Sequence, residues 1–159
     1  LETLNDEQLG LLSVHHQCGS AHHDITVQRY SAVAKFNVDV MPFVEDMSAA
    51  YQWADLVICS AGALNVAELA ETGTPSILVP LPHAIDDHQT RNAQALSSQG
   101  AAQLVRQIDM TPARLGKLIT SYLEIPSRLQ MMAAKARDVA KPQATGAVVG
   151  ALEEVAHAA

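Results

Sequence analysis

The sequence is poor in several residue types that mark common classes of protein. Aromatic residues make up only 4% of the 159 positions and charged residues only 17%, whereas 48% are hydrophobic. The core must therefore consist mainly of aliphatic side chains, and the chain is too apolar to be disordered. The two cysteines, Cys18 and Cys59, make no disulfide framework, which favours a reducing compartment.

Long apolar runs and an excess of positive charge are also missing. No run reaches the roughly 18–20 apolar residues that a membrane span needs, and we expect no signal peptide. The net charge of −7 leaves no basic footprint for nucleic acid, which we therefore exclude as a main partner. The negative charge does not exclude a phosphate ligand, because backbone N–H groups at a helix start bind phosphate without Lys or Arg.

Short apolar runs alternate with segments of helical periodicity, which predicts an α/β fold. The segments that we expect to be strands are 11–15, 36–41, 55–59, 76–79 and 102–105. The helices that we expect between them are 24–34, 46–53, 63–71 and 88–98. Because runs such as D-L-V-I-C-S are apolar throughout, the strands should form a parallel sheet with helices on both faces.

The pattern becomes purely helical after about residue 106. Thr111 and Pro112 suit the N-cap and the first position of a helix. The helices that we expect there are 112–123, 127–140 and 144–157. We therefore predict one domain over 1–159, with an α/β core over about 1–106 and C-terminal helices over 111–159.

Small residues follow the expected strand 55–59 and open the next helix, in the run S-A-G-A-L-N-V-A-E. Such a loop lets a ligand approach the backbone closely, and the N–H groups and dipole of the helix start suit a diphosphate. Glu68 lies about one turn inside the helix, where it can accept hydrogen bonds from sugar hydroxyls. The alternative is an ordinary strand-to-helix turn with a solvated glutamate.

A polar run, P-L-P-H-A-I-D-D-H-Q-T-R-N, leaves the expected strand 76–79. Ligands of open α/β sheets bind at the carboxyl ends of strands. Gln89 and Asn92 share one helix face, and their neutral amides can both donate to and accept from sugar hydroxyls. The alternative is a polar helix start that is capped by Asp86 or Asp87.

A third run, M-P-F-V-E-D-M, follows the expected strand 36–41. An exposed backbone beside Phe43 and Val44 would hold a flat base by its edge. The alternative places Phe43 in the core.

Histidines and a cysteine gather near the N-terminus without matching a metal site. The residues concerned are His15, His16, Cys18, His22 and His23. Their spacing fits no compact zinc pattern and no second cysteine pair follows, so we expect no metal and no cofactor. A G-x-S-x-G nucleophile elbow is absent as well.

The three runs, in this order and spacing, resemble the MurG family of glycosyltransferases. The matching text is M-P-F-V-E-D-M-S-A-A-Y-Q-W-A-D-L-V-I-C-S-A-G-A-L-N-V-A-E-L-A, then G-T-P-S-I-L-V-P-L-P-H, D-H-Q-T-R-N-A and G-A-A. The resemblance implies a hexosyltransferase of peptidoglycan synthesis, and hence a link to cell division and cell shape. It implies inverting transfer of N-acetylglucosamine from UDP-N-acetylglucosamine to undecaprenyl-diphosphate-muramoyl-pentapeptide.

The family resemblance also implies the architecture. The family has two Rossmann-like domains in the GT-B arrangement and works peripherally at the cytoplasmic face of the bacterial inner membrane. The matched text corresponds to the C-terminal, donor-binding domain without its first strand. We therefore expect a fragment that is inactive alone, lacks the N-terminal acceptor domain with its catalytic base, and has a sheet interrupted between 11–15 and 55–59.

Site roles carry over from the family residue by residue. Val44, beside Phe43, aligns with the position whose backbone meets uracil, and Glu68 with the carboxylate that takes the ribose hydroxyls. Gln89 and Asn92 align with amides that hold N-acetylglucosamine, and His83 begins their loop. Ala63, Leu64 and Asn65 align with the helix-start loop that holds the diphosphate side, and we expect the neighbouring Gly62, Val66 and Ala67 to belong to the substrate-binding site as well.

Two positions depart from the family pattern, and two other functions compete with the transferase. Ser60 stands where the family often has Arg, and Ala61 where Ser is usual. A UDP-N-acetylglucosamine 2-epimerase has the same fold and a similar small loop with Glu. A non-catalytic nucleotide-binding module is the other alternative. The amides Gln89 and Asn92 favour the transferase.

Overall fold

The computed structural model describes residues 3–33, 36–82 and 87–141, and the isolated positions 143, 146, 149, 150 and 153. Every strand pair in it is parallel and helices alternate with the strands, so the predicted α/β class is confirmed. His83, Asp86 and most of the helix expected at 144–157 lie outside the described residues.

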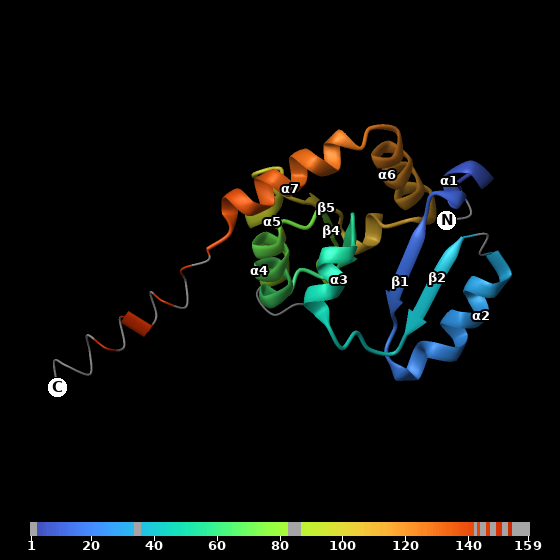
Figure 1. Ribbon diagram of the computed structural model, residues 1–159, viewed down its shortest axis with the longest axis horizontal. Helices are drawn as coiled ribbons and strands as arrows, with labels where there is room; N and C mark the ends of the chain where they lie inside the picture. The colour runs from blue at the N-terminus through green and yellow to red at the C-terminus, as the bar shows by residue number, and fades with distance from the viewer. Residues whose placement is uncertain are drawn as a thin grey trace.

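The first half of the chain forms a two-stranded sheet with one covering helix. Its elements are α1 (Asp6–Gly10), β1 (Ser13–Gln17), η1 (Ser20–His22), α2 (His23–Val33) and β2 (Asn37–Met41). Ser13 lies opposite Asn37 and Gln17 opposite Met41. Helix α2 packs against β2, as Figure 1 shows on the right of the molecule.

A three-stranded sheet, in the order β3-β4-β5, organises the rest. Its elements are α3 (Met47–Trp53), β3 (Val57–Cys59), α4 (Ala63–Thr72), β4 (Ser76–Leu78), α5 (His88–Ser97) and β5 (Gln103–Leu104). The chain then continues through η3 (Gln107–Asp109), α6 (Pro112–Glu124) and α7 (Ser127–Val139). Helix α7 packs on α4, and α5 packs on both α4 and β5.

Capping explains where several helices begin. The Thr111 hydroxyl accepts from the N–H of Arg114 at 3.2 Å, and Pro112 is the first helical residue, as predicted. The Asp46 carboxylate caps α3 in the same way, at 2.9 Å from the N–H of Ala49. At α5 the N-cap residue is Asp87, one of the two aspartates named for that position, but it has a left-handed φ of 54° and its side chain makes no cap bond.

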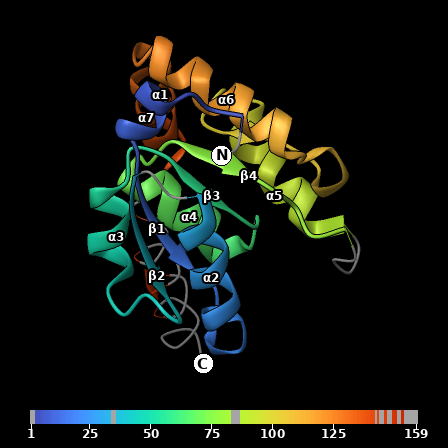
Figure 2. The ribbon, with the colours of Figure 1, turned by 90° about the vertical axis from the view of Figure 1, so that its right-hand side faces the viewer.

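Helix α1 was not predicted from the apolar pattern. A reciprocal capping box forms it: the Asn5 side chain accepts from the N–H of Gln8 at 2.8 Å, and the Gln8 side chain accepts from the N–H of Asn5 at 3.1 Å. Because Leu11 is the C-cap of this helix, β1 starts later than expected. Figures 1 and 2 both show α1 beside α6, and Gln8 donates from Nε2 to the Thr120 hydroxyl at 3.2 Å.

The predicted interruption of the sheet is confirmed. Among the described strands, β1 pairs only with β2, and β3 pairs only with β4. A side-chain contact joins the first sheet to α3: the rings of His15 on β1 and Trp53 on α3 stack with centroids 3.7 Å apart. In the part of the chain that the structure describes, only β4 has a strand partner on both sides, so β1, β2, β3 and β5 each keep one unpaired edge, a surface that proteins normally cover.

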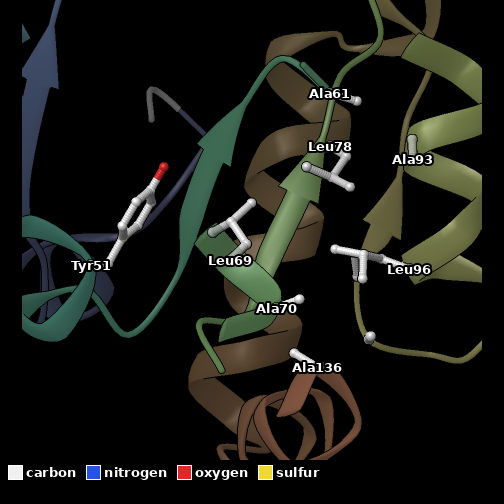
Figure 3. Close-up of a cluster of buried hydrophobic side chains, with 10 residues drawn as sticks. Tyr51, Ala61, Leu69, Ala70, Leu78, Ala93, Leu96 and Ala136 are labelled. Atoms are coloured by element: carbon white, nitrogen blue, oxygen red, sulfur yellow. The ribbon is translucent and has the colours of Figure 1, made fainter. Parts of the chain in front are cut away.

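The core is aliphatic, as the composition predicts, and is centred on β4. Leu69, Ile77 and Leu78 are fully buried. Figure 3 shows Leu78 on β4 between Leu69 on α4 and Leu96 on α5, with small alanines filling the remaining positions. A tightly packed base of this kind holds the loops at the strand ends in place.

Candidate functional site

The loop between β3 and α4 leaves the start of α4 open. Gly62 is the N-cap residue, with φ −60°, and makes no side-chain cap bond. A Cβ added to Gly62 would meet only the Asn65 side chain, at 3.8 Å or more. Neither backbone conformation nor protein packing therefore requires glycine here, and the space beside Gly62 at the start of the helix is free.

Two asparagine amides, from two different helices, hold this loop. Asn65 on α4 donates from Nδ2 to the carbonyl oxygen of Ser60 at 3.2 Å. Asn92 on α5 donates from Nδ2 to the carbonyl oxygen of Ala61 at 3.1 Å. The regions that follow β3 and β4 therefore meet at the carboxyl ends of their strands, as expected for ligand loops of a parallel sheet.

Glu68 is exposed but is not merely a solvated helix residue. The hydroxyl of Tyr51, on α3, donates to Glu68 Oε2 at 3.0 Å. Burial first, and then this hydrogen bond, raise the pKa of Tyr51 above its ordinary value, so the phenol stays a neutral donor. Sequence reasoning missed Tyr51 because nothing in the local spacing joins it to Glu68.

The thiol of Cys59, at the end of β3, is also kept neutral. Its burial raises the pKa to about 11, so the thiolate is a minor form at neutral pH. Cys59 therefore adds no negative charge to a site that we expect to hold a diphosphate. Cys59 and Cys18 are both free, as the sequence predicts.

The loop after β2 is anchored to the end of β1. The N–H of Val44 donates to Gln17 Oε1 at 2.9 Å, so the backbone group expected to meet a base is occupied by a side chain of the protein. Gln17 is a second residue that sequence reasoning missed. Phe43 is 68% exposed, so the alternative that places it in the core is wrong.

The remaining predicted residues lie around the start of α4 and α5. Gln89 accepts through Oε1 from the N–H of Leu81 at 3.0 Å, which ties α5 back to its preceding loop. Leu64 is 77% exposed, whereas Val66 packs against the core. The side chain of Val66 therefore serves packing, and only its backbone remains a candidate for ligand contact.

Two hollows lie away from these loops. One of about 330 Å³, between α2 and β2, is lined by Val27, Tyr30, Ser31, Val38 and Val40. The other, of about 420 Å³ at the start of α6, is lined by Ile108, Asp109, Thr111, Ala113, Arg114 and Lys117. Neither of these two hollows is lined by a predicted site residue.

Metal-binding and membrane-spanning features are absent from the part of the chain that the structure describes. Within it, no three His, Cys, Asp or Glu side chains gather as metal ligands. His23 instead contacts the carbonyl oxygen of Val40, at 3.2 Å, and the Asp24 carboxylate. None of the described helices is long and apolar enough to cross a bilayer.

Comparisons with known proteins place this geometry in context. Residues 2–148 match the family model described as "Glycosyltransferase family 28 C-terminal domain". The chain is 54% identical over 145 residues to the UDP-N-acetylglucosamine–N-acetylmuramyl-(pentapeptide) pyrophosphoryl-undecaprenol N-acetylglucosamine transferase of Pseudomonas paraeruginosa. It is 54% identical over 144 residues to the protein of the same name from Stutzerimonas stutzeri. Each match covers 91% of this chain and 40% of the relative, so the chain spans about 40% of their length.

Solved structures give the same picture. Acinetobacter baumannii MurG matches with a TM-score of 0.82 and 44% identity, over 94% of this chain and 46% of that protein. The glycosyltransferase VinC, in complex with dTDP, matches with a TM-score of 0.66 and 17% identity, over 96% of this chain and 37% of that protein. At 17% identity the VinC match shows the fold alone. Both matches confirm the predicted α/β architecture.

Proposed function

Because the chain belongs to the glycosyltransferase family 28 C-terminal domains, we propose that it is the domain that binds the donor, UDP-N-acetylglucosamine. The whole protein would then transfer N-acetylglucosamine to undecaprenyl-diphosphate-muramoyl-pentapeptide during peptidoglycan synthesis. The names of the relatives at 54% identity support this function over a 2-epimerase or a non-catalytic module.

One observation carries the proposal: an uncapped helix start faces free space and has an anchored carboxylate one turn further along. Gly62 leaves the first turn of α4 without a side-chain cap. Asn65 and Asn92 fix the preceding loop through its carbonyl groups. A diphosphate supplies the negative charge that such a helix start favours, and needs no Lys or Arg to do so.

Each part of the donor would meet a different strand end. The N–H groups of Ala63, Leu64 and Asn65 would hold the diphosphate, and Glu68, next to Ala67, would accept from the ribose hydroxyls. The Val44 backbone would meet the uracil edge once the base displaces the Gln17 amide, which now accepts from its N–H at 2.9 Å. The amides of Gln89 and Asn92 would contact the N-acetylglucosamine, because amides both donate and accept.

The acceptor side belongs to polypeptide outside this chain. We propose that residues 1–159 form a single UDP-sugar-binding domain, whose partner domain binds the lipid-linked acceptor and supplies the catalytic base. The full protein would work peripherally at the cytoplasmic face of the inner membrane, where the lipid-linked acceptor is. We propose no metal or cofactor: the backbone N–H groups and the partial positive charge of the helix start would hold the diphosphate.

Substituting Gly62 separates ligand approach from folding. Gly62→Ala should leave the free energy of unfolding within about 1 kcal/mol of wild type, because φ −60° suits alanine and the nearest contact is 3.8 Å. The added methyl group would occupy space that the diphosphate needs. We therefore expect the dissociation constant for UDP to rise roughly tenfold, equivalent to about 1.4 kcal/mol, in a calorimetric titration.

Gly10→Ala is the matched control, since a Cβ at Gly10 meets nothing within 4 Å and the position lies in α1, away from the loops. It should bind UDP as wild type does. If Gly62→Ala also binds UDP as tightly as wild type, the diphosphate does not approach this helix start and the proposed site is wrong.

A further inference from the structure

Tyr51 is a buried polar residue whose hydroxyl reaches the edge of the candidate site. The side chain is only 5% exposed, yet its hydroxyl donates to the exposed carboxylate of Glu68 at 3.0 Å. Figure 3 shows the hydroxyl pointing toward the end of the sheet at which Ala61 lies. A buried tyrosine hydroxyl needs a hydrogen-bond partner, and here that partner is a carboxylate of the candidate site.

The residue is fixed from more than one side. Its ring belongs to the same buried cluster as Leu69 and Ala70. Its backbone carbonyl oxygen accepts from the hydroxyl of Thr74, which is only 4% exposed, at 3.3 Å. The Thr74 hydroxyl in turn lies 2.7 Å from that of Thr72, on the same helix as Glu68. The core therefore holds the Tyr51 hydroxyl, which donates to Glu68, in a fixed position.

The carboxylate keeps capacity for a ligand. An ionised carboxylate has two oxygens and about four acceptor sites, and Tyr51 uses one oxygen, Oε2. A free glutamate on a helix surface samples several rotamers and must lose that freedom when it binds a ligand. A glutamate that is already held in one rotamer has lost the freedom beforehand, and binding is tighter for that reason.

We propose that Tyr51 is a positioning residue of the donor site: it fixes Glu68 so that the carboxylate meets the ribose hydroxyls, and thereby helps the domain to select ribonucleotides. The inference rests on the proposed function, because it assigns the ribose to Glu68. It adds a residue that never touches the ligand but determines how strongly the ribose is recognised.

The test compares two ligands that differ only at the ribose, UDP and 2′,3′-dideoxy-UDP, by calorimetric titration. Tyr51→Phe keeps the packed ring and removes only the hydroxyl. It should weaken UDP binding roughly three- to tenfold and leave dideoxy-UDP binding unchanged, since that ligand offers Glu68 no hydroxyl. Tyr30→Phe is the control, because its hydroxyl pairs with His16 Nδ1 at 3.0 Å, and it should change neither.

A double-variant cycle separates positioning from general support of the fold. If Tyr51 acts through Glu68, Tyr51→Phe should have no further effect on UDP binding in a Glu68→Ala background. Equal weakening of both ligands by Tyr51→Phe, or additive effects of the two substitutions, would overturn the inference while leaving the site intact. If wild type fails to discriminate between the two ligands, the ribose role of Glu68 fails, and the proposed function fails with it.

Discussion

Supplied with UDP-N-acetylglucosamine and a lipid-linked muramoyl-pentapeptide, the 159-residue chain should transfer no measurable sugar, even though it should bind UDP. The chain spans about 40% of the transferases that it resembles, and we place the acceptor site in the remaining part. Holding two reactants in one geometry is worth about 7–11 kcal/mol, so its loss slows transfer by roughly five orders of magnitude or more.

The measurement is the rate of radiolabelled N-acetylglucosamine incorporation into lipid by the purified chain. The full-length Pseudomonas paraeruginosa relative is the positive control, and a reaction without protein sets the background. Incorporation by the chain above that background would show that these residues contain the acceptor site and the catalytic base as well. The proposal that the acceptor site and the catalytic base lie outside this chain would then be wrong.

Replacing Glu68 has the second-largest expected effect. Hydrogen bonds to a charged group contribute about 1.5–3 kcal/mol each, so Glu68→Ala should raise the dissociation constant for UDP at least tenfold. In a full-length protein, Glu68→Ala should leave the dissociation constant for the lipid acceptor unchanged. Glu71→Ala, an exposed carboxylate in the last turn of the same helix, is the control and should bind UDP normally.

Glu68→Ala should also affect stability, for a reason that only the structure reveals. Without the carboxylate, the hydroxyl of Tyr51 loses its partner inside a side chain that is 5% exposed. Because Glu68 is exposed, water can take the place of its carboxylate, and the loss of this hydrogen bond should cost about 0.5–1.5 kcal/mol. A solvated glutamate would change neither the thermal midpoint nor UDP affinity, so wild-type values for both would remove Glu68 from the site.

Much of the fold could be predicted because its strands are short continuous apolar runs. The run at 55–59 predicts a buried parallel strand; β3 is found there at Val57–Cys59, parallel to β4, but it is only partly buried, since Ile58 is 45% exposed. The interruption of the sheet could also be predicted, but only from the family resemblance, since nothing in composition or periodicity indicates a missing strand. Helix α1 was missed because its signal is a polar capping box rather than an apolar stripe.

The partners of the site residues could not be predicted, because they are distant in sequence. Tyr51 and Glu68 are 17 positions apart, Gln17 and Val44 are 27 apart, and Asn92 and Ala61 are 31 apart. Helical spacing informs only about residues three or four positions apart. The strand ends must come together before these side chains can form hydrogen bonds with the site residues. The pairing is therefore a property of the tertiary structure.

The most direct test of the central claim is an amide-resolved nuclear magnetic resonance titration of the chain with UDP. The donor-domain account predicts that the largest shift changes fall at Val44, at 63–65 and at Glu68. The amide of Leu81 should shift as well, since it donates to Gln89. Residues lining the two hollows, such as Val38 and Lys117, should stay unchanged. Changes centred on either hollow, or no changes at millimolar UDP, would contradict the account.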